Sequence, residues 1–472
     1  MTEASDGAKS AAARGRSFPD SLVLIFGFVV AAQLLSYVVP QGAFERTTVD
    51  GRERPVPGTY APLETPVVLE PWAFLEAVPE GFAAAQEIIF LVFLTGGVVA
   101  LMRRTGAIDA GLLTAVRRLD HAPWVLIGGC LLLFSLGAFT IGMGEEYVPL
   151  VPILVTMSLA MRMDAIVALG MVWVPYGIGW AAAAINPFGV LIAQDIAGVP
   201  PASGWGFRSV MLLVFLGIGF QHVYAYALKV RARPEESLVR DVDYSEGYAP
   251  PRDVAFTRRR SLILLLFVAG LAFFVWGAQK YQWYIAELDR VFLGLGLLIA
   301  LVGGLRPNEA SRAFLAGAAE MTSAALIIGF ARAIEVVLSE GKILDTLLYA
   351  VATPLETAPP DLAALGMLAV QTLTNLFIPS GSGQAFVTMP IMSPLATLTG
   401  LPQQTAVLAY QFGDGFTNML VPTSALVMGT LDLGRVPYAA WFRFCAPLLL
   451  KLFAAAIVFL LLSVHFPDAL GL

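Results

Sequence analysis

The chain has 472 residues, of which 57% are hydrophobic and 14% are charged. Soluble domains carry about 25% charged residues, so this composition excludes a soluble globular protein and predicts an all-α polytopic membrane protein. The formal net charge of −6 does not decide the topology, because orientation in a membrane follows where Lys and Arg lie.

Residues 1–20 are small and polar, and we expect them to form a disordered cytoplasmic tail. After them, apolar runs that approach the ~20 residues of a spanning helix recur along the whole chain. These runs predict about nine full spans, at 22–40, 86–102, 165–198, 206–228, 261–278, 287–305, 320–338, 405–430 and 442–464.

Basic residues orient these spans. Arg14 and Arg16 precede the first span, and the polar segment 229–260 carries eight Lys and Arg residues. By the positive-inside rule, we predict a cytoplasmic N-terminus, a basic cytoplasmic loop at 229–260 and a C-terminus outside. The segment 41–71, rich in proline, then lies outside. We expect a multi-pass protein of the cytoplasmic (inner) membrane, surrounded by the lipid bilayer.

Three pairs of segments suggest that the chain is duplicated. TGAIDAGLLTAV (105–116) matches EGKILDTLLYAV (340–351), GMGEEYVPLVPI (142–153) resembles GSGQAFVTMPIM (381–392), and AAAAINPFGV (181–190) resembles FGDGFTNMLVP (412–422). Transporters are commonly built from two halves of inverted topology. We therefore predict repeat 1 at 21–228 with an inward-opening re-entrant hairpin at 122–161, a linking span at 261–280, and repeat 2 at 281–472 with an outward-opening hairpin at 361–400.

The least helix-friendly stretches of the chain lie at the predicted hairpin tips and helix breaks. Irregular backbone survives in a membrane only inside the protein or beside water, and broken helices direct their partial charges at substrates and ions. We predict that the tip at Ser380–Gly383 meets a break around Asn418, and that the tip at Gly142–Glu146 meets a break at Asn186–Pro187. The alternative is that these residues only permit tight packing or a kink.

Ionisable residues inside the membrane are rare and usually functional. Glu145, Glu146 and Asp414 lie at the predicted tips and breaks, and Asp195 lies nearer the end of its segment. Two adjacent glutamates favour a cationic partner, and we expect Glu145 to face the site while Glu146 pairs internally. A salt bridge that fixes the tip is the alternative. Arg332 and Glu335 are spaced i, i+3, so we interpret them as an internal ion pair.

NPFGVLIAQDIAGVPPASGWGFR (186–208) and IPSGSGQAFVTMPIMSPLATLTGLPQQTAVLAYQFGDGFTNMLVPTS (378–424) resemble the YfcC-type, arginine/ornithine antiporter-like branch of the anaerobic C4-dicarboxylate carrier family, within the ion transporter superfamily. The resemblance implies a homodimer with scaffold and transport domains and an elevator-type movement. The substrate-binding residues that it implies are Glu145, Glu146, Asn186, Pro187, Ser380, Gly381, Ser382, Gly383, Gln384, Asn418 and Thr423. The ion-coupling residues that it implies are Gly142, Gly144, Asp414 and Thr417.

We therefore expect a secondary transporter or exchanger of amino acids, with basic ones such as arginine or ornithine favoured. The alternative substrates are C4-dicarboxylates or other small carboxylates, with Na⁺ or H⁺ as the coupling ion and Na⁺ bound at the hairpin tips. A channel would need a continuous polar pore, whereas the polar groups here are confined to the breaks. The sequence contains no paired catalytic set or cofactor motif, so we expect neither an enzyme nor a nucleic-acid-binding protein, and no cofactor apart from the coupling ion.

Overall fold

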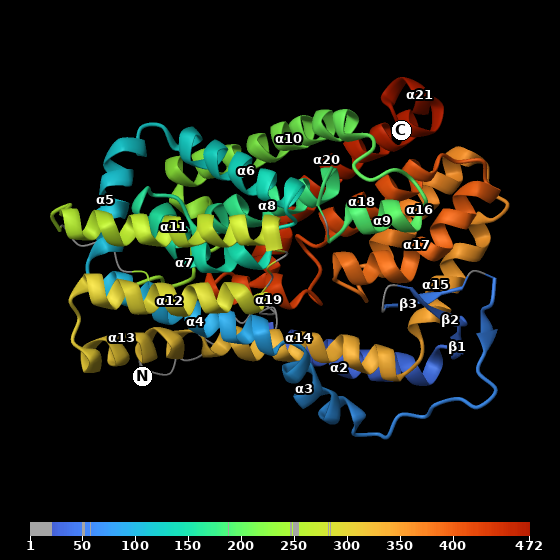
Figure 1. The fold of residues 1–472 in the computed structure, drawn as a ribbon, viewed down its shortest axis with the longest axis horizontal. Helices are drawn as coiled ribbons and strands as arrows, with labels where there is room; N and C mark the ends of the chain where they lie inside the picture. The colour runs from blue at the N-terminus through green and yellow to red at the C-terminus, as the bar shows by residue number, and fades with distance from the viewer. Residues whose placement is uncertain are drawn as a thin grey trace, which may run out of the picture.

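The computed structural model describes residues 21–49, 52–56, 58–186, 188–245, 248, 254–281, 283 and 285–472. The predicted tail at 1–20 lies outside the described residues. Helices make up most of the described chain, and most of them run roughly parallel to the long axis of Figure 1 in two layers.

The lower layer in Figure 1 contains helices from the beginning and the middle of the chain. Its members are α2 (Ser21–Val38), α3 (Ala73–Ala84), α4 (Gln86–Arg104), α12 (Ile285–Gly303), α13 (Pro307–Glu320) and α14 (Thr322–Glu340). α14 packs against α2 and α3, and α4 packs against α12 and α13.

The upper layer surrounds one fully buried helix. It contains α6 (Pro123–Thr140), α8 (Ala165–Ala182), α9 (Val190–Ile196), α10 (Trp205–Ala232), α16 (Pro360–Thr374), α17 (Gly381–Leu398), α18 (Gln403–Thr417) and α20 (Tyr438–His465). All 18 residues of α8 are buried, because α6, α10, α18 and α7 (Val151–Ala160) pack around it. A helix that is apolar on every side is stable only in such a central place.

Short elements join or flank the layers. α19 (Ala425–Leu433) packs against α14 of the lower layer and also contacts α8 and α20, so it connects the two layers. The others are η1 (Glu145–Leu150), which precedes α7, and α5 (Ala107–Leu119), η2 (Pro234–Glu236), α11 (Arg258–Tyr281), α15 (Leu344–Ala352), η3 (Thr353–Leu355) and α21 (Pro467–Leu470).

The elements of the second half follow the order of those in the first half. α4 and α14 have 19 residues each, and α10 and α20 have 28 each. Between the members of each half lie, in the same order, a short helix, a helix–turn–helix unit, a helix that ends at a break and another short helix. This order is what a duplicated chain requires. The duplication itself, the inverted orientation of the halves and the re-entrant nature of the hairpins stay predictions.

Six of the described helices are long and apolar enough to cross a membrane, namely α4, α6, α8, α10, α14 and α20. We predicted about nine spans, and among these six only α6 was assigned to a hairpin instead. Large apolar side chains are exposed on several helices, for example Leu213, Leu297 and Leu450. Contiguous exposed apolar surface is unfavourable in water, so this surface belongs in lipid and the protein is a multi-pass membrane protein.

Two predicted loops contain regular structure. In the segment 41–71, β1 (Gly42–Ala43) pairs with β4 (Ala61–Pro62), and β2 (Arg46–Val49) pairs with β3 (Arg52–Pro55), both antiparallel. The β2–β3 ribbon contacts α17. The basic loop is shorter than the predicted 229–260, because α10 continues to Ala232 and α11 begins at Arg258.

Candidate functional site

The first predicted tip is the turn between α6 and η1, and it depends on a glycine. Gly142 has a φ of +82°, and a Cβ there would lie 2.5 Å from Oδ1 of Asn186, so no other residue fits without displacement. The carboxylate of Glu146 turns back and accepts the backbone N–H of Gly144 at 2.7 Å. Glu146 therefore stabilises the tip itself and is buried.

The first break separates α8 from α9, and Asn186 fixes its shape. Its Nδ2 donates to the carbonyl of Ala138 at 3.2 Å, and its Oδ1 accepts the N–H of Phe188 at 2.8 Å. These bonds join the break to the last turn of α6 and pair one N–H group within the break. Pro187 lies outside the described residues.

A buried guanidinium caps the end of α8. Arg208, on α10, donates to the carbonyl of Ala183 and to Oε1 of Gln404, each at 3.0 Å, and also to Gln411. Gln411 donates to the same carbonyl at 3.1 Å. A cation is favourable at a helix C-terminus because the last carbonyls carry partial negative charge. The side chains of Arg208 and Gln411 thus satisfy the carbonyl group of Ala183, at the end of α8.

The second predicted tip is the turn between α16 and α17. Ser380 caps α17, and its Oγ accepts the N–H of Gly383 at 3.4 Å. Gly381 lies flat against α8, since a Cβ there would be 2.4 Å from Cζ3 of Trp180. Its carbonyl accepts the hydroxyl proton of Tyr410 at 2.7 Å. The tip therefore packs against both α8 and α18.

The second break begins after α18, next to a buried carboxylate. Oδ1 of Asp414 accepts from Nδ2 of Asn418 at 2.8 Å. Nδ2 of Asn375 donates to Oγ1 of Thr417 at 2.7 Å, to Oδ1 of Asn418 at 3.1 Å and to the carbonyl of Asp414 at 3.2 Å. Oδ2 of Asp414 faces the second tip, 3.2 Å from the position of a Cβ on Gly381. Tip and break thus form one polar cluster.

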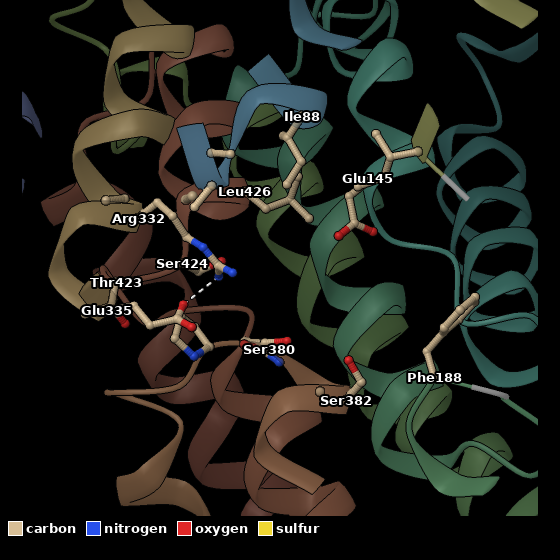
Figure 2. A pocket seen from close by; sticks show the side chains of 18 of the residues that line it. Ile88, Glu145, Phe188, Arg332, Glu335, Ser380, Ser382, Thr423, Ser424 and Leu426 are labelled. Carbon is tan, nitrogen blue, oxygen red and sulfur yellow. Dashed lines mark ion pairs between the residues drawn. The ribbon is translucent and has the colours of Figure 1, made fainter. Parts of the chain in front are cut away.

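A cavity of about 280 Å³ lies where the two layers meet. The upper layer contributes the first tip, Tyr176 and Trp180 of α8, and the second tip; the lower layer contributes the start of α4 and part of α14. Figure 2 shows Ser380 and Ser382 along one side, with Arg332 and Glu335 beside them and Glu145 across from that pair. Residues of both predicted tips therefore line the same space.

The charged residues that line the cavity are mostly acidic. Among the described lining residues, they are Glu87, Glu145 and Glu335 against one guanidinium, Arg332. Two helix N-termini also reach the cavity, because α17 begins at Gly381 and α19 follows Ser424. Helix N-termini attract anions. The cavity can therefore hold a molecule that has cationic groups and also a carboxylate.

The predicted site residues fall into two groups. Those that line the cavity are Gly142, Glu145, Ser380, Gly381, Ser382, Asn418 and Thr423. Those that lie behind the lining are Gly144, Glu146, Asn186, Gly383, Gln384, Asp414 and Thr417, of which all but Gly383 are buried. Gln384 points away from the cavity, because its Nε2 donates to Oε1 of Gln371 at 2.7 Å. These second-group residues shape the tips and breaks.

Several residues that shape the site were not predicted from the sequence. Arg332 and Glu335 form the expected ion pair, at 2.5 Å, but the pair also lines the cavity. Tyr176 and Trp180 were hidden in the uniformly apolar sequence of α8. Asn375 could have been noticed, because it is a polar residue at the end of α16 in an apolar stretch just before the second tip.

The second break contains oxygen atoms that are candidate ligands for a cation. No group of three or more His, Cys, Asp or Glu residues in the described chain is arranged to hold a metal ion. Around Asp414, however, the donor set consists of carboxylate, amide and carbonyl oxygens, which suit Na⁺ or a carboxyl proton. Oδ1 of Asn375 is buried there and has no hydrogen-bond partner among the described residues. The cluster therefore has oxygen atoms that a small cation could use.

A family model of C4-dicarboxylate anaerobic carriers (DcuC) matches residues 18–465. The chain belongs to this family. It is a membrane carrier of the secondary-transporter class and not an enzyme.

Two curated relatives match the DcuC-family chain over almost its whole length. A protein of Escherichia coli (strain K12) that carries the name "Putative basic amino acid antiporter YfcC" is 32% identical over 93% of this chain and 94% of its own. An uncharacterized protein of Haemophilus influenzae (strain Rd) is 30% identical over 92% of this chain and 94% of its own.

Two solved transporter structures are more distant from this carrier. The YdaH transporter of Alcanivorax borkumensis is 17% identical, with a TM-score of 0.44 over 96% of this chain and 100% of its own. MtrF of Neisseria gonorrhoeae, which is described among antimetabolite efflux pumps, is 17% identical, with a TM-score of 0.42 over 97% of each chain.

Proposed function

We propose that this carrier exchanges basic amino acids such as arginine or ornithine across the cytoplasmic membrane. The observation that carries the proposal is the charge pattern of the cavity, which is lined by three glutamates, one arginine and two helix N-termini. A basic amino acid has two cationic groups and one carboxylate. The name of the E. coli relative gives independent support for an antiporter of this class.

Glu145 is the residue that we assign to the substrate's side-chain cation. It lines the cavity, whereas Glu146 is turned toward the backbone of Gly144. The α-carboxylate would bind at the N-terminus of α17, around Ser380 and Ser382. Thr423 supports a polar ligand at this end, because its buried Oγ1 has no hydrogen-bond partner among the described residues.

We further propose an elevator-type movement in a homodimer. The lower layer would be the scaffold and the upper layer, with its two hairpins, the transport domain. The cavity supports this assignment because it lies between the layers and not within one of them. Asp414 would carry the coupling ion, H⁺ or Na⁺, since an ionised buried carboxylate needs a cation or a proton.

C4-dicarboxylate exchange is the second candidate. The family description and the two helix N-termini favour it, whereas the three glutamates oppose it by repulsion. Competition separates the candidates. Arginine and ornithine, but not succinate or fumarate, should compete with labelled arginine for uptake into proteoliposomes that contain the purified protein.

A pair of adjacent substitutions tests the assignment of the glutamates. Glu145→Gln should weaken arginine binding by about 1.5–3 kcal/mol, the usual contribution of a charge-assisted hydrogen bond, or roughly 10–150-fold in Kd. Glu146→Gln is the matched control and should leave Kd within about threefold. Succinate outcompeting arginine, with an unchanged arginine Kd in Glu145→Gln, would favour the dicarboxylate instead.

A further inference from the structure

We propose that Arg332 and Glu335 bind the α-carboxylate and the α-amino group of the substrate, so that the carrier selects intact α-amino acids. This inference rests on the proposed transport of basic amino acids and adds the part of the site that recognises the head group. The pair lies on α14, outside both hairpin tips and both helix breaks.

The pair lies in the apolar middle of α14, whose other polar residues are at its two ends. Nη1 of Arg332 lies 2.5 Å from Oε2 of Glu335, and the two side chains are 37% and 30% exposed. Ala331, Ala333 and Ile334, on the same turns, are buried. Both charged residues line the cavity, and Figure 2 shows them at its edge, beside Ser424 and above Ser380. The cavity is therefore the space into which this pair presents its remaining polar atoms.

Several groups that favour an anion converge on the guanidinium. The N-termini of α17 and α19 line the same part of the cavity through Ser380 and Ser424. A guanidinium has five N–H donors, so Arg332 can keep its contact with Glu335 and still bind a carboxylate in the bidentate way that favours arginine. The α-carboxylate would thus lie between Arg332 and the N-terminus of α17.

Glu335 supplies the complementary charge for the α-ammonium group. A guanidinium and a carboxylate three residues apart on one helix face present a charge pair that matches the zwitterionic head group of an amino acid. Figure 2 shows Glu145 on the far side of the cavity from this pair. A molecule with its head group on α14 would therefore direct a long side chain with a terminal cation toward Glu145.

The plainer interpretation is that the pair only neutralises two charges within the membrane. The protein contains a second ion pair of the same spacing that lies away from the cavity. Arg290 and Glu287, on α12, are also spaced i, i+3, at 2.8 Å, and neither lines the cavity. Arg290→Gln is therefore the control for loss of such a pair outside the site.

The experiment uses two arginine analogues that each lack one half of the head group. Agmatine keeps the amine and the guanidinium but has no carboxylate, and Nα-acetylarginine keeps the carboxylate but has no ammonium. Each is measured by competition with labelled arginine in proteoliposomes that contain the full-length protein. The wild type should prefer arginine to both analogues by tenfold or more.

The variants should lose these preferences selectively. Arg332→Gln should weaken the binding of arginine by tenfold or more and change the binding of agmatine by no more than about twofold. Glu335→Gln should weaken the binding of both arginine and agmatine and leave the binding of Nα-acetylarginine unchanged. Arg332→Lys should retain part of the preference for arginine, and Arg290→Gln should retain all of it.

Equal weakening of arginine and agmatine binding in Arg332→Gln, or an unchanged affinity for arginine, would overturn the inference. Failure of the wild type to bind arginine would instead overturn the proposed function.

Discussion

Asn418 donates a hydrogen bond to the carboxylate of Asp414 at 2.8 Å, across the point where α18 ends. The bond joins the last turn of a buried helix to the segment that breaks it. Asp414 is 1% exposed, and its other oxygen faces the tip of the second hairpin at Gly381. A change in the charge of Asp414 would therefore alter the electrostatic environment of both the break and the tip.

Replacing Asp414 tests whether this carboxylate couples transport to an ion gradient. Asp414→Asn keeps the shape of the side chain and removes its charge, so expression and folding should remain near normal. Accumulation driven by an H⁺ or Na⁺ gradient should fall by tenfold or more, because the variant can neither take up a proton nor attract a cation. Asp195→Asn, on the exposed part of α9, is the control. Normal accumulation by Asp414→Asn would show that Asp414 does not couple transport to the ion gradient.

Adding a methyl group at Gly381 tests how closely the second tip must approach α8. A Cβ there would lie 2.4 Å from the ring of Trp180, and overpacking of this kind typically costs about 1–3 kcal/mol. Gly381→Ala should lower the melting temperature in detergent and reduce uptake by tenfold or more. Gly206→Ala, on α10, meets no atom within 4 Å and should leave both quantities unchanged or slightly raise the first. Full activity of Gly381→Ala would show that close packing of the tip against the ring of Trp180 is not needed for transport.

Asp164 provides a prediction on pH, because it lies in the turn between α7 and α8, outside the spans. It accepts hydrogen bonds from Tyr226 and Ser237, each at 2.7 Å, and from the N–H of Val167 at 3.1 Å. Burial raises the pKa of Asp164 above its ordinary value, although these three bonds oppose the rise. Protonated Asp164 therefore adds to the free energy of unfolding. This contribution is complete below the pKa of Asp164 in the unfolded chain, about 3.9, and is lost as the pH rises through its pKa in the folded protein.

Asp164→Asn removes this titration while preserving much of the shape. The difference in melting temperature, variant minus wild type, should become more positive as the pH is raised from about 4 to 7, because only the wild type then carries a buried charge. Asp164→Ala should be less stable than Asp164→Asn at every pH, since it leaves the hydroxyl groups of Tyr226 and Ser237 without their acceptor. A difference that does not change with pH would contradict the assigned pKa shift.

The sequence predicted the places where helices stop better than the contacts between helices. Glycine, serine and proline act locally, so the turn at Gly142, the start of α17 after Ser380 and the break at Asn418 were identifiable from the chain alone. The predicted hairpin at 361–400 coincides with α16 and α17, which cover Pro360–Leu398. The short ribbons in 41–71 were missed because strands of two to four residues have too little alternation to be recognised.

The lining of the cavity could not be predicted in the same way. Helical spacing indicated that Arg332 pairs with Glu335, but it cannot show which distant segment faces the pair. Arg208 precedes an apolar run and resembles a flanking charge in the sequence, yet it is buried against Ala183, which is 25 residues earlier in the chain. Gln384 belongs to the second tip by sequence but is turned toward Gln371. These contacts depend on how the layers meet.

Single cysteines at the two tips test the inverted arrangement of the hairpins. With Cys130 and Cys445 replaced, Ser382→Cys should react with a membrane-impermeant thiol reagent added from outside, and Met143→Cys with the same reagent added from inside. Both side chains are partly buried, so labelling should occur in the conformational state that opens each hairpin and should slow when substrate is bound. The expected sides follow from the basic residues, which place the segment between α10 and α11 in the cytoplasm. Labelling of both positions from one side only, in every state sampled, would exclude two hairpins of opposite orientation and with them the proposed movement.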